Sequence, residues 1–237
     1  MKKYILTLAL ATAQMVLMAQ TVNVHFKNGQ TINYPSDNVD YVDFSEKTPS
    51  PTLTAGAVVD LGLSVYWASC NLGAEKPDEY GGYYAWGEIS PKNTYYENNY
   101  TYYNKETREY IDLGANICGT SYDAATVNLG KDWRMPTKSE MEELINKCTW
   151  TWGKHGDLYG FVVTGKNNNS IFLPAAGSKS GMASISKGSW LSYWTGSTSD
   201  SAKADYLDAK ENAAMMTANR IYGYPIRPVT SNPNVGQ

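Results

Sequence analysis

The feature that most constrains this chain is one capped amphipathic helix, TKSEMEELINKC, which begins at Thr137. Thr137 and Glu140 have the S/T-x-x-E spacing of a capping box, in which each side chain accepts a hydrogen bond from the other residue's backbone. Met141, Leu144 and Ile145 then recur at helical spacing and form one apolar stripe. We therefore expect this helix to pack on a core, and we expect Thr137 and Glu140 to have structural roles.

Helical periodicity occurs in one further segment, SYDAATVNLG, where Ser121 or Asp123 is the expected N-cap and Gly130 the expected stop. Short segments rich in β-branched and aromatic residues surround the two helices, for example VVDLGLSVYWASC, YGFVVTG, SIFLPAAG and SYWTGSTS. The links between them are too short for helical crossovers, which favours antiparallel pairing. The sequence therefore predicts an α+β domain with an antiparallel sheet and two helices.

The N-terminus has the pattern of a secretory signal peptide, because Lys2 and Lys3 precede an apolar run that ends at Ala19. This run is shorter than the roughly 20 apolar residues that a membrane-spanning helix requires. We therefore expect residues 1–19 to be removed and no transmembrane segment to remain. The mature chain is expected to be exported to the periplasm, to the outer surface or into the medium.

A β-hairpin is expected next, because TVNVHFKNGQTINY alternates apolar and polar residues around the turn Asn28–Gly29. NVDYVDF, residues 38–44, is a candidate third strand, and a linker rich in Pro, Ser and Thr follows it. The expected organisation is a signal peptide at 1–19, a hairpin segment at 20–47, a linker at 48–56, a main domain at 57–230 and a tail at 231–237.

The charge balance argues against nucleic acid as a partner. The chain has 20 Lys and Arg residues against 23 Asp and Glu residues, and loss of the signal peptide raises the acidic excess to about five charges. Aromatic residues are mainly Tyr (19) and Trp (7) rather than Phe (4). Tyr and Trp carry a polar O–H or N–H group on an apolar ring, so they suit half-buried, hydrated surfaces.

Cysteine count and spacing limit the covalent and metal chemistry. Cys70, Cys118 and Cys148 allow at most one intramolecular disulfide in an exported protein. A bridge between Cys70 and Cys148 is one interpretation, and three buried thiols are the other. The spacings match no zinc pattern, and the chain lacks the clustered oxygen-ligand phrases of calcium lectins. We therefore expect no metal site and no cofactor.

Hydrolytic catalysis has little support in the sequence, because the two histidines, His25 and His155, form no recognisable set with Ser, Cys or Asp. Arg134 is either a clamp for an anionic ligand or, as we expect, half of a buried ion pair with Asp123 or Asp132. Four tryptophans are expected to be core or half-core residues: Trp150, Trp152, Trp190 and Trp194. The chain is therefore expected not to be an enzyme.

The best candidate for a binding surface is the tyrosine loop, NTYYENNYTYYNK, residues 93–105. Tyr rings offer flat apolar area and a hydroxyl group at low cost in conformational entropy. The alternative is that these rings fold back and cover the edge of the sheet. The candidate ligand-binding residues are Tyr95, Tyr96, Tyr100, Tyr102 and Tyr103.

Several phrases occur here in the order found in one family of secreted bacterial domains: VDLGLSVYWASCNLGAEKPDEYGGYYAWGE, YDAATVNLGKDWRMPTKSEMEEL, CTWTW, SIFLPAAG, YWTGST and IRPV. Over residues 57–230 the chain resembles the Fibrobacter succinogenes major paralogous domain family, whose function is largely undefined. The resemblance implies a C-type lectin-like fold in which the first and last strands pair. The N-terminal hairpin resembles a segment at the start of many Bacteroidetes surface proteins.

The phrase WRMPTKSEMEEL is also similar to RLPTEAEWE of the formylglycine-generating enzymes, which share the lectin-like fold. Those enzymes use two late cysteines, whereas this chain has no Cys after Cys148. The leading hypothesis is therefore an exported, non-catalytic, calcium-independent lectin-like module whose ligand is a glycan or a protein. A structural or adhesive surface component is the alternative, and a formylglycine-type enzyme is the third.

Overall fold

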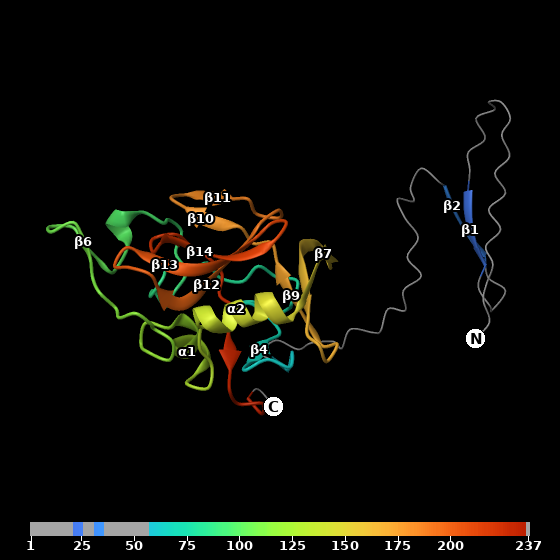
Figure 1. Cartoon of the computed structure of the whole chain (residues 1–237). Coiled ribbons are helices and arrows are strands. Elements are labelled where there is room, and N and C mark those ends of the chain that lie inside the picture. Colours follow the sequence, from blue (N-terminus) through green and yellow to red (C-terminus); the bar gives the residue numbers. More distant parts are fainter. Residues whose placement is uncertain (1–20, 26–30, 36–56, 236–237) are drawn as a thin grey trace. The chain divides into compact units, whose positions relative to one another are not determined.

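The structure is a computed structural model that describes residues 21–25, 31–35 and 57–235 (Figure 1). The chain divides into two compact units, residues 1–50 and residues 51–237. In the first unit, β1 (Thr21–His25) and β2 (Thr31–Pro35) pair in antiparallel register, as the hairpin prediction requires. The expected signal peptide, the linker and the candidate strand at 38–44 lie outside the described residues.

The second unit contains α1 (Ala124–Leu129), α2 (Lys138–Lys147) and the 3-10 helix η2 (Glu97–Asn99). Its strands are β3 (Val58–Val59), β4 (Tyr66–Ala68), β5 (Tyr103–Asn104), β6 (Glu109–Tyr110), β7 (Thr149–His155), β8 (Leu158–Thr164), β9 (Ser170–Pro174), β10 (Ser178–Ser180), β11 (Ala183–Ile185), β12 (Leu191–Thr198), β13 (Lys203–Ala209), β14 (Ala213–Asn219) and β15 (Val229–Thr230). They form several small antiparallel sheets, in the orders β15-β4-β3, β7-β8-β9, β12-β13-β14, β5-β6 and β10-β11. The predicted α+β class is confirmed, with several sheets in place of one.

Helix α2 has the cap and the apolar stripe that its sequence predicts. The Thr137 hydroxyl accepts the Glu140 N–H at 3.3 Å, and the Glu140 carboxylate accepts the Thr137 N–H at 2.8 Å. Met141 and Leu144 are 1% and 0% exposed. The helix packs beneath the β12-β13-β14 sheet, on the side away from the β10–β11 hairpin (Figure 1).

Helix α1 also begins and ends at predicted residues. Asp123 is the N-cap, and its carboxylate accepts the N–H groups of Ala125 and Thr126 at 2.9 and 3.2 Å. Gly130 ends the helix with φ of +94°, a region that disfavours side chains with a Cβ. The choice between Ser121 and Asp123 is therefore settled for Asp123.

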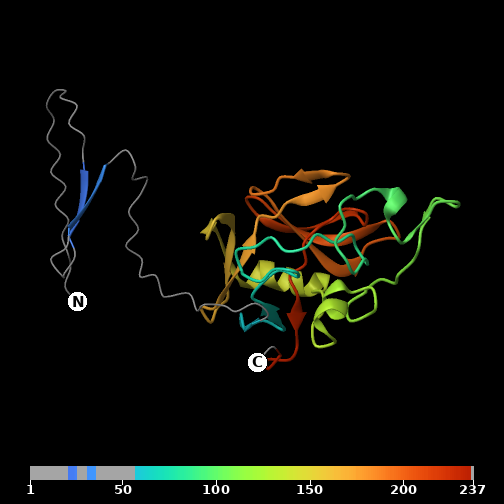
Figure 2. The same cartoon turned by 180° about the vertical axis from the view of Figure 1, so that it is seen from behind.

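The two ends of the domain meet, because β15 pairs with β4 and places Val229 opposite Trp67. A fully buried Arg227 strengthens this junction, since its guanidinium donates to the carbonyls of Ser69 and Phe172 at 2.7 Å. Burial lowers the pKa of Arg227. The long segment from β4 to α1 then runs across the body of the domain (Figure 2).

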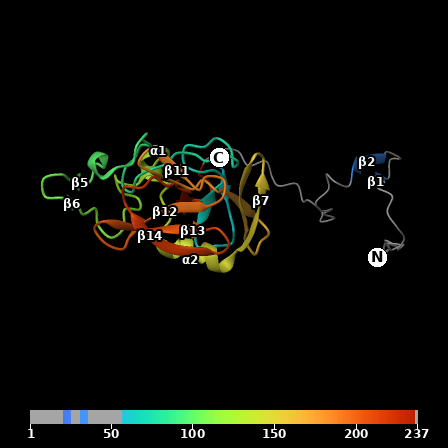
Figure 3. The ribbon, with the colours of Figure 1, turned by 90° about the horizontal axis from the view of Figure 1, so that it is seen from above.

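The core has two large clusters of buried side chains. One surrounds Trp67 and Leu144 and joins α2 to three of the sheets. The other surrounds Trp86 and Trp194 and joins α1 to the β12-β13-β14 sheet. The β5–β6 hairpin and the β7–β8 hairpin lie at opposite ends of this body (Figure 3). Candidate sites at these two ends are therefore well separated.

Candidate functional site

Two members of the tyrosine loop are core residues. Tyr95 and Tyr100 are each 2% exposed and form a third apolar cluster with Ala85. Their hydroxyl groups donate to backbone carbonyls, Tyr95 to Tyr83 and Tyr100 to Trp86, both at 2.6 Å. The expectation that these two rings contact a ligand is corrected, because neither ring face is open.

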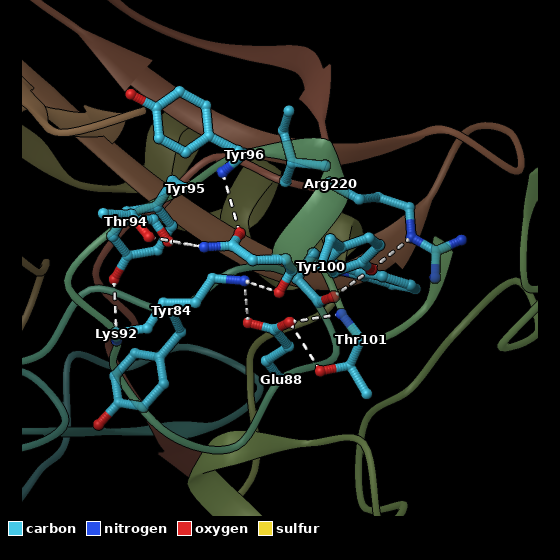
Figure 4. A network of polar contacts seen from close by, with 12 residues as sticks. Tyr84, Glu88, Lys92, Thr94, Tyr95, Tyr96, Tyr100, Thr101 and Arg220 are labelled. Carbon is cyan, nitrogen blue, oxygen red and sulfur yellow. Dashed lines mark hydrogen bonds and ion pairs between the residues drawn. The ribbon is translucent and has the colours of Figure 1, made fainter. Parts of the chain in front are cut away.

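A polar network holds the loop against the domain (Figure 4). Glu88 pairs with Lys92 at 2.7 Å and accepts hydrogen bonds from the Thr101 N–H and hydroxyl at 2.8 and 2.9 Å. The buried Arg220 donates to the Tyr100 hydroxyl at 3.0 Å and stacks 4.7 Å from the centroid of the Trp86 ring. These contacts fix the buried part of the loop, at Tyr100 and Thr101, within the domain.

The other three tyrosines of the candidate set differ in exposure. Tyr102 and Tyr103 are half-buried and make edge-on contacts with neighbouring rings, at 5.4 Å between the centroids of Tyr102 and Tyr122 and 5.2 Å between those of Tyr103 and Tyr110. Tyr96 is 47% exposed. The packing therefore favours the sheet-covering interpretation for the loop, with Tyr96 as the one open ring of the five candidates.

Arg134 is half of a partly buried ion pair, as expected, but its partner is Glu140. The guanidinium donates to both carboxylate oxygens at 2.7 and 2.5 Å. The predicted partners are wrong, because the Asp123 carboxylate caps α1 and also accepts the Met135 N–H, while Asp132 is exposed. Hydrogen bonding to Glu140 raises the pKa of Arg134. Burial opposes ionisation of Glu140, but hydrogen bonds from Arg134 and Thr137 outweigh it and lower the pKa.

The Cys70–Cys148 bridge is not formed, because all three cysteines are free thiols. Cys70 is buried in the chain beside Arg227, whereas Cys148 is the C-cap of α2 and packs on the cluster around Trp67. Cys118 lies in a third environment, where burial raises its pKa to about 12. A thiol with so high a pKa is protonated at neutral pH and a poor nucleophile.

A pocket lies between the β10–β11 hairpin and the strands β12 and β13. Its volume is about 190 Å³, below the roughly 300–1,000 Å³ of pockets for drug-sized ligands. It therefore suits a small ligand or one ring of a longer ligand. The pocket, named here the Trp190–Asp208 pocket, is lined by Ser178, Trp190, Ser192, Tyr206, Asp208 and Tyr224.

Strand register brings the polar groups of this pocket together. Ser192 on β12 is directly opposite Asp208 on β13, so both side chains lie on the same face of the sheet. The indole N–H of Trp190 donates to the Asp208 carboxylate at 2.6 Å, and the Tyr206 hydroxyl also contacts this carboxylate. Burial raises the pKa of Asp208, although these two hydrogen bonds oppose the shift.

Aromatic rings form one wall of the pocket. Tyr224 stacks on Trp194 at 4.3 Å between centroids, and Tyr206 lies 4.8 Å from Tyr224. Burial raises the pKa of both tyrosines, so their hydroxyl groups remain protonated donors at neutral pH. The arrangement combines apolar ring surface with a carboxylate acceptor and several hydroxyl groups.

The roof of the pocket, the β10–β11 hairpin, is held by two backbone bridges. Lys179 exchanges hydrogen bonds with Gly223 at 2.8 and 2.9 Å. Gly181 exchanges a second pair with Tyr95 at 2.8 and 2.9 Å. The tyrosine loop therefore supports the roof of the pocket without lining it.

Sequence reasoning missed this pocket and placed Trp190 among the half-core residues. Trp190 is indeed half-buried, so its burial was predicted correctly, but its contact with Asp208 was not. The register of β12 and β13 places Asp208 opposite Ser192, two positions after Trp190, and so brings the carboxylate near the indole. An irregularity between Trp194 and Thr198 shifts this register, so the sequence of the turn does not predict it.

Side chains that could bind a metal ion do not cluster in the described part of the chain. Among residues 57–235 and the two described N-terminal strands, no group of three or more His, Cys, Asp and Glu residues is placed to hold a metal ion. His155 stacks on Phe172 at 5.0 Å between ring centroids, and its buried Nδ1 has no hydrogen-bond partner in the described part of the chain.

No helix within the described residues is long and apolar enough to span a membrane.

Comparison with known proteins gives no relative, since no family model, no curated protein and no solved structure matches this chain.

Proposed function

We propose that this chain is an exported, non-catalytic binding module and that it binds a glycan in the Trp190–Asp208 pocket. The observation that carries the proposal is the hydrogen-bonded pair of Trp190 and Asp208 beside the rings of Tyr206 and Tyr224. A sugar ring presents C–H groups on one face and hydroxyl groups around its edge. Aromatic walls suit the face, and a carboxylate with nearby hydroxyl groups suits the edge.

The size and the charge of the pocket favour the same ligand class. A volume of about 190 Å³ limits the bound part to a single ring. A half-buried carboxylate disfavours anionic ligands and accepts hydrogen bonds from neutral hydroxyl groups. We therefore propose a neutral sugar ring, bound without calcium.

The joining of the first and last strands of the domain, β3 and β15, through β4 and the position of α2 after the WRMPT phrase support a C-type lectin-like arrangement for residues 57–230. We include this fold assignment in the proposal. It gives no ligand by itself, because fold kinship does not determine function. The proposal of glycan binding rests on the residues of the pocket.

The test is a calorimetric titration with the methyl α- and β-glycosides of glucose, galactose, mannose and N-acetylglucosamine. We expect at least one to bind, and Asp208→Asn to weaken it about tenfold, which is about 1.4 kcal/mol. Asp132→Asn, the same change at an exposed position, is the matched control and should bind normally. Affinity should be equal in calcium chloride and in EDTA. Absence of binding by all eight compounds, or equal binding by Asp208→Asn, would refute the proposal.

A second candidate is a structural or adhesive surface component without a small-molecule site. The observation that favours it is the burial of Tyr95 and Tyr100, since the richest aromatic segment of the chain stabilises the domain. Under this alternative, Asp208→Asn would change no binding property. The same titration therefore separates the two candidates.

A further inference from the structure

A second aromatic surface lies at the turn end of the β7–β8 hairpin, away from the Trp190–Asp208 pocket. Trp152 and Tyr159 are 40% and 49% exposed, so the expectation that Trp152 is a core or half-core residue is wrong. Their ring planes differ by only 11°, and their centroids are 6.2 Å apart. The two rings therefore stack on each other, and both remain partly open to solvent.

The register of the hairpin explains why these rings are exposed. Trp152 is opposite Phe161 and Lys154 is opposite Tyr159, so all four side chains lie on one face of the sheet. Phe161 belongs to the core, but the hairpin continues past the core to its turn at Gly156. Gly156 has φ of +57°, which a tight hairpin turn requires. The apolar face of the sheet thus extends beyond the elements that could cover it.

The exposed rings are also held in place. Trp152 makes an edge-on contact with Phe161, at 5.0 Å between centroids and 71° between planes, and Phe161 is 4% exposed. Trp150 contacts the same Phe161 ring at 5.6 Å. Because a buried residue braces it, Trp152 loses little conformational entropy when a ligand stacks on it.

The small area of the surface restricts its occupant. Rings of this size have roughly 150–250 Å² each, so two rings that are less than half exposed offer on the order of 200 Å². A stable protein–protein interface needs about 800 Å² from each partner. The border is polar, with Lys154 Nζ 3.9 Å from the Asp157 carboxylate. A narrow ligand with flat apolar faces and a polar edge fits better than a second protein.

We propose that Trp152 and Tyr159 form a platform, separate from the Trp190–Asp208 pocket, on which a β-1,4-linked glycan chain lies. In such chains successive pyranose rings form a flat ribbon whose C–H faces are apolar. The faces of aromatic rings carry negative partial charge and attract those C–H groups. Lys154 donates to ring hydroxyl groups at the border. The platform does not depend on the pocket, because the two share no residue.

The test follows the indole N–H signals of the seven tryptophans in the ¹⁵N-labelled full chain. The probes are cellohexaose, xylohexaose, mannohexaose and chitohexaose, with the helical maltohexaose as a control for chain shape. We expect at least one β-linked hexasaccharide to shift the Trp152 signal, and maltohexaose not to shift it. No shift of the Trp152 signal with any of the four β-linked probes would overturn the proposal.

Single-residue variants identify which rings contact the glycan. We expect Tyr159→Ala and Trp152→Ala each to weaken binding about tenfold. Tyr96→Ala, which removes an equally exposed ring from the tyrosine loop, should leave binding unchanged. If Trp152→Ala does not fold, Trp152→Phe keeps a smaller ring and should weaken binding less than Tyr159→Ala. Equal losses for Tyr96→Ala and Tyr159→Ala would contradict the platform.

Two further measurements separate this proposal from its competitors. Asp208→Asn should leave the Trp152 shift intact, so failure of the pocket and failure of the platform are distinguishable. Sedimentation of the full chain should show no dimer that Trp152→Ala dissociates. Such a dimer would show that a second copy covers the rings and would overturn the glycan platform.

Discussion

The tyrosine loop and the Trp190–Asp208 pocket are both built from aromatic rings with polar groups, but they use those groups differently. In the loop, the hydroxyl groups of Tyr95 and Tyr100 donate to backbone carbonyls within the domain. In the pocket, the rings of Tyr206 and Tyr224 border a cavity that also contains a carboxylate. Composition therefore does not distinguish a binding surface from a structural cover. The distinction lies in whether a cavity borders the rings, as it does at Tyr206 and Tyr224 but not at the buried Tyr95 and Tyr100.

The comparison predicts the largest stability effect in the loop. Tyr100→Ala removes a buried ring and leaves Arg220 without its hydroxyl partner, so we expect a loss of about 3 kcal/mol in the free energy of unfolding. Affinity at the pocket, measured well below the unfolding midpoint, should stay within about twofold because Tyr100 does not line the pocket. Denaturant titration and calorimetry measure the two quantities. An Ala variant of normal stability that binds weakly would instead place the ligand on the loop.

The ion pair of Arg134 and Glu140, which includes no aromatic ring, should give the next largest effect on the free energy of unfolding. Glu140→Gln keeps an acceptor for the Thr137 N–H but removes the charge that pairs with Arg134, so we expect a loss of about 2 kcal/mol. The pKa of Glu140 is lowered, so its contribution is present above the usual carboxyl range and disappears as pH falls through the lowered pKa. Wild type and variant should therefore converge in stability at acid pH. A difference that persists there would assign the effect to packing.

In the pocket the expected effects are reversed, with affinity changing more than stability. Tyr206→Phe removes a hydroxyl group from the Asp208 carboxylate and should weaken a bound sugar about tenfold. The free energy of unfolding should fall by no more than about 1 kcal/mol. Tyr110→Phe is the matched control, because it removes a hydroxyl that contacts Glu97 and Asn219 in the loop region. The control should bind normally, and weakened binding there would remove the contrast between the two regions.

The smallest effect concerns the stability cost of the pocket carboxylate. The folded-state pKa of Asp208 is raised, so its contribution to stability is greatest below the usual carboxyl range and is lost as pH rises through the raised value. Relative to wild type, Asp208→Asn should therefore gain in melting temperature as pH rises from acid to neutral. Thermal unfolding at several pH values measures this trend. A variant that becomes relatively less stable toward neutral pH would show that the ionised carboxylate has a structural role.

Local signals in the sequence were sufficient for the helices and several strands. The capping box at Thr137 and the stop at Gly130 depend on residues a few positions apart, so they could be predicted and were confirmed. The partner of Arg134 was predicted wrongly, because Asp123 is occupied by backbone N–H groups of α1 and the segment after it. Which acid remains available depends on the folded backbone.

The pocket could not be predicted, because its residues come from separate elements. Ser178 comes from β10, Trp190 precedes β12, and Tyr224 follows β14. Their meeting depends on the pairing of Lys179 with Gly223 and on the β12–β13 register, which are non-local. The burial of the tyrosine loop depends likewise on Arg220, more than a hundred positions from Tyr100. Periodicity and motif spacing contain neither relation.

The most direct test of the central claim is a backbone NMR titration of the ¹⁵N-labelled chain with the tightest-binding methyl glycoside. If the pocket is the binding site, the largest shifts will fall on residues 190–192 and 206–208, and the signals of residues 94–103 will move little. Largest shifts at residues 94–103, with those of 190–192 and 206–208 unmoved, would contradict the assignment and return the site to the tyrosine loop.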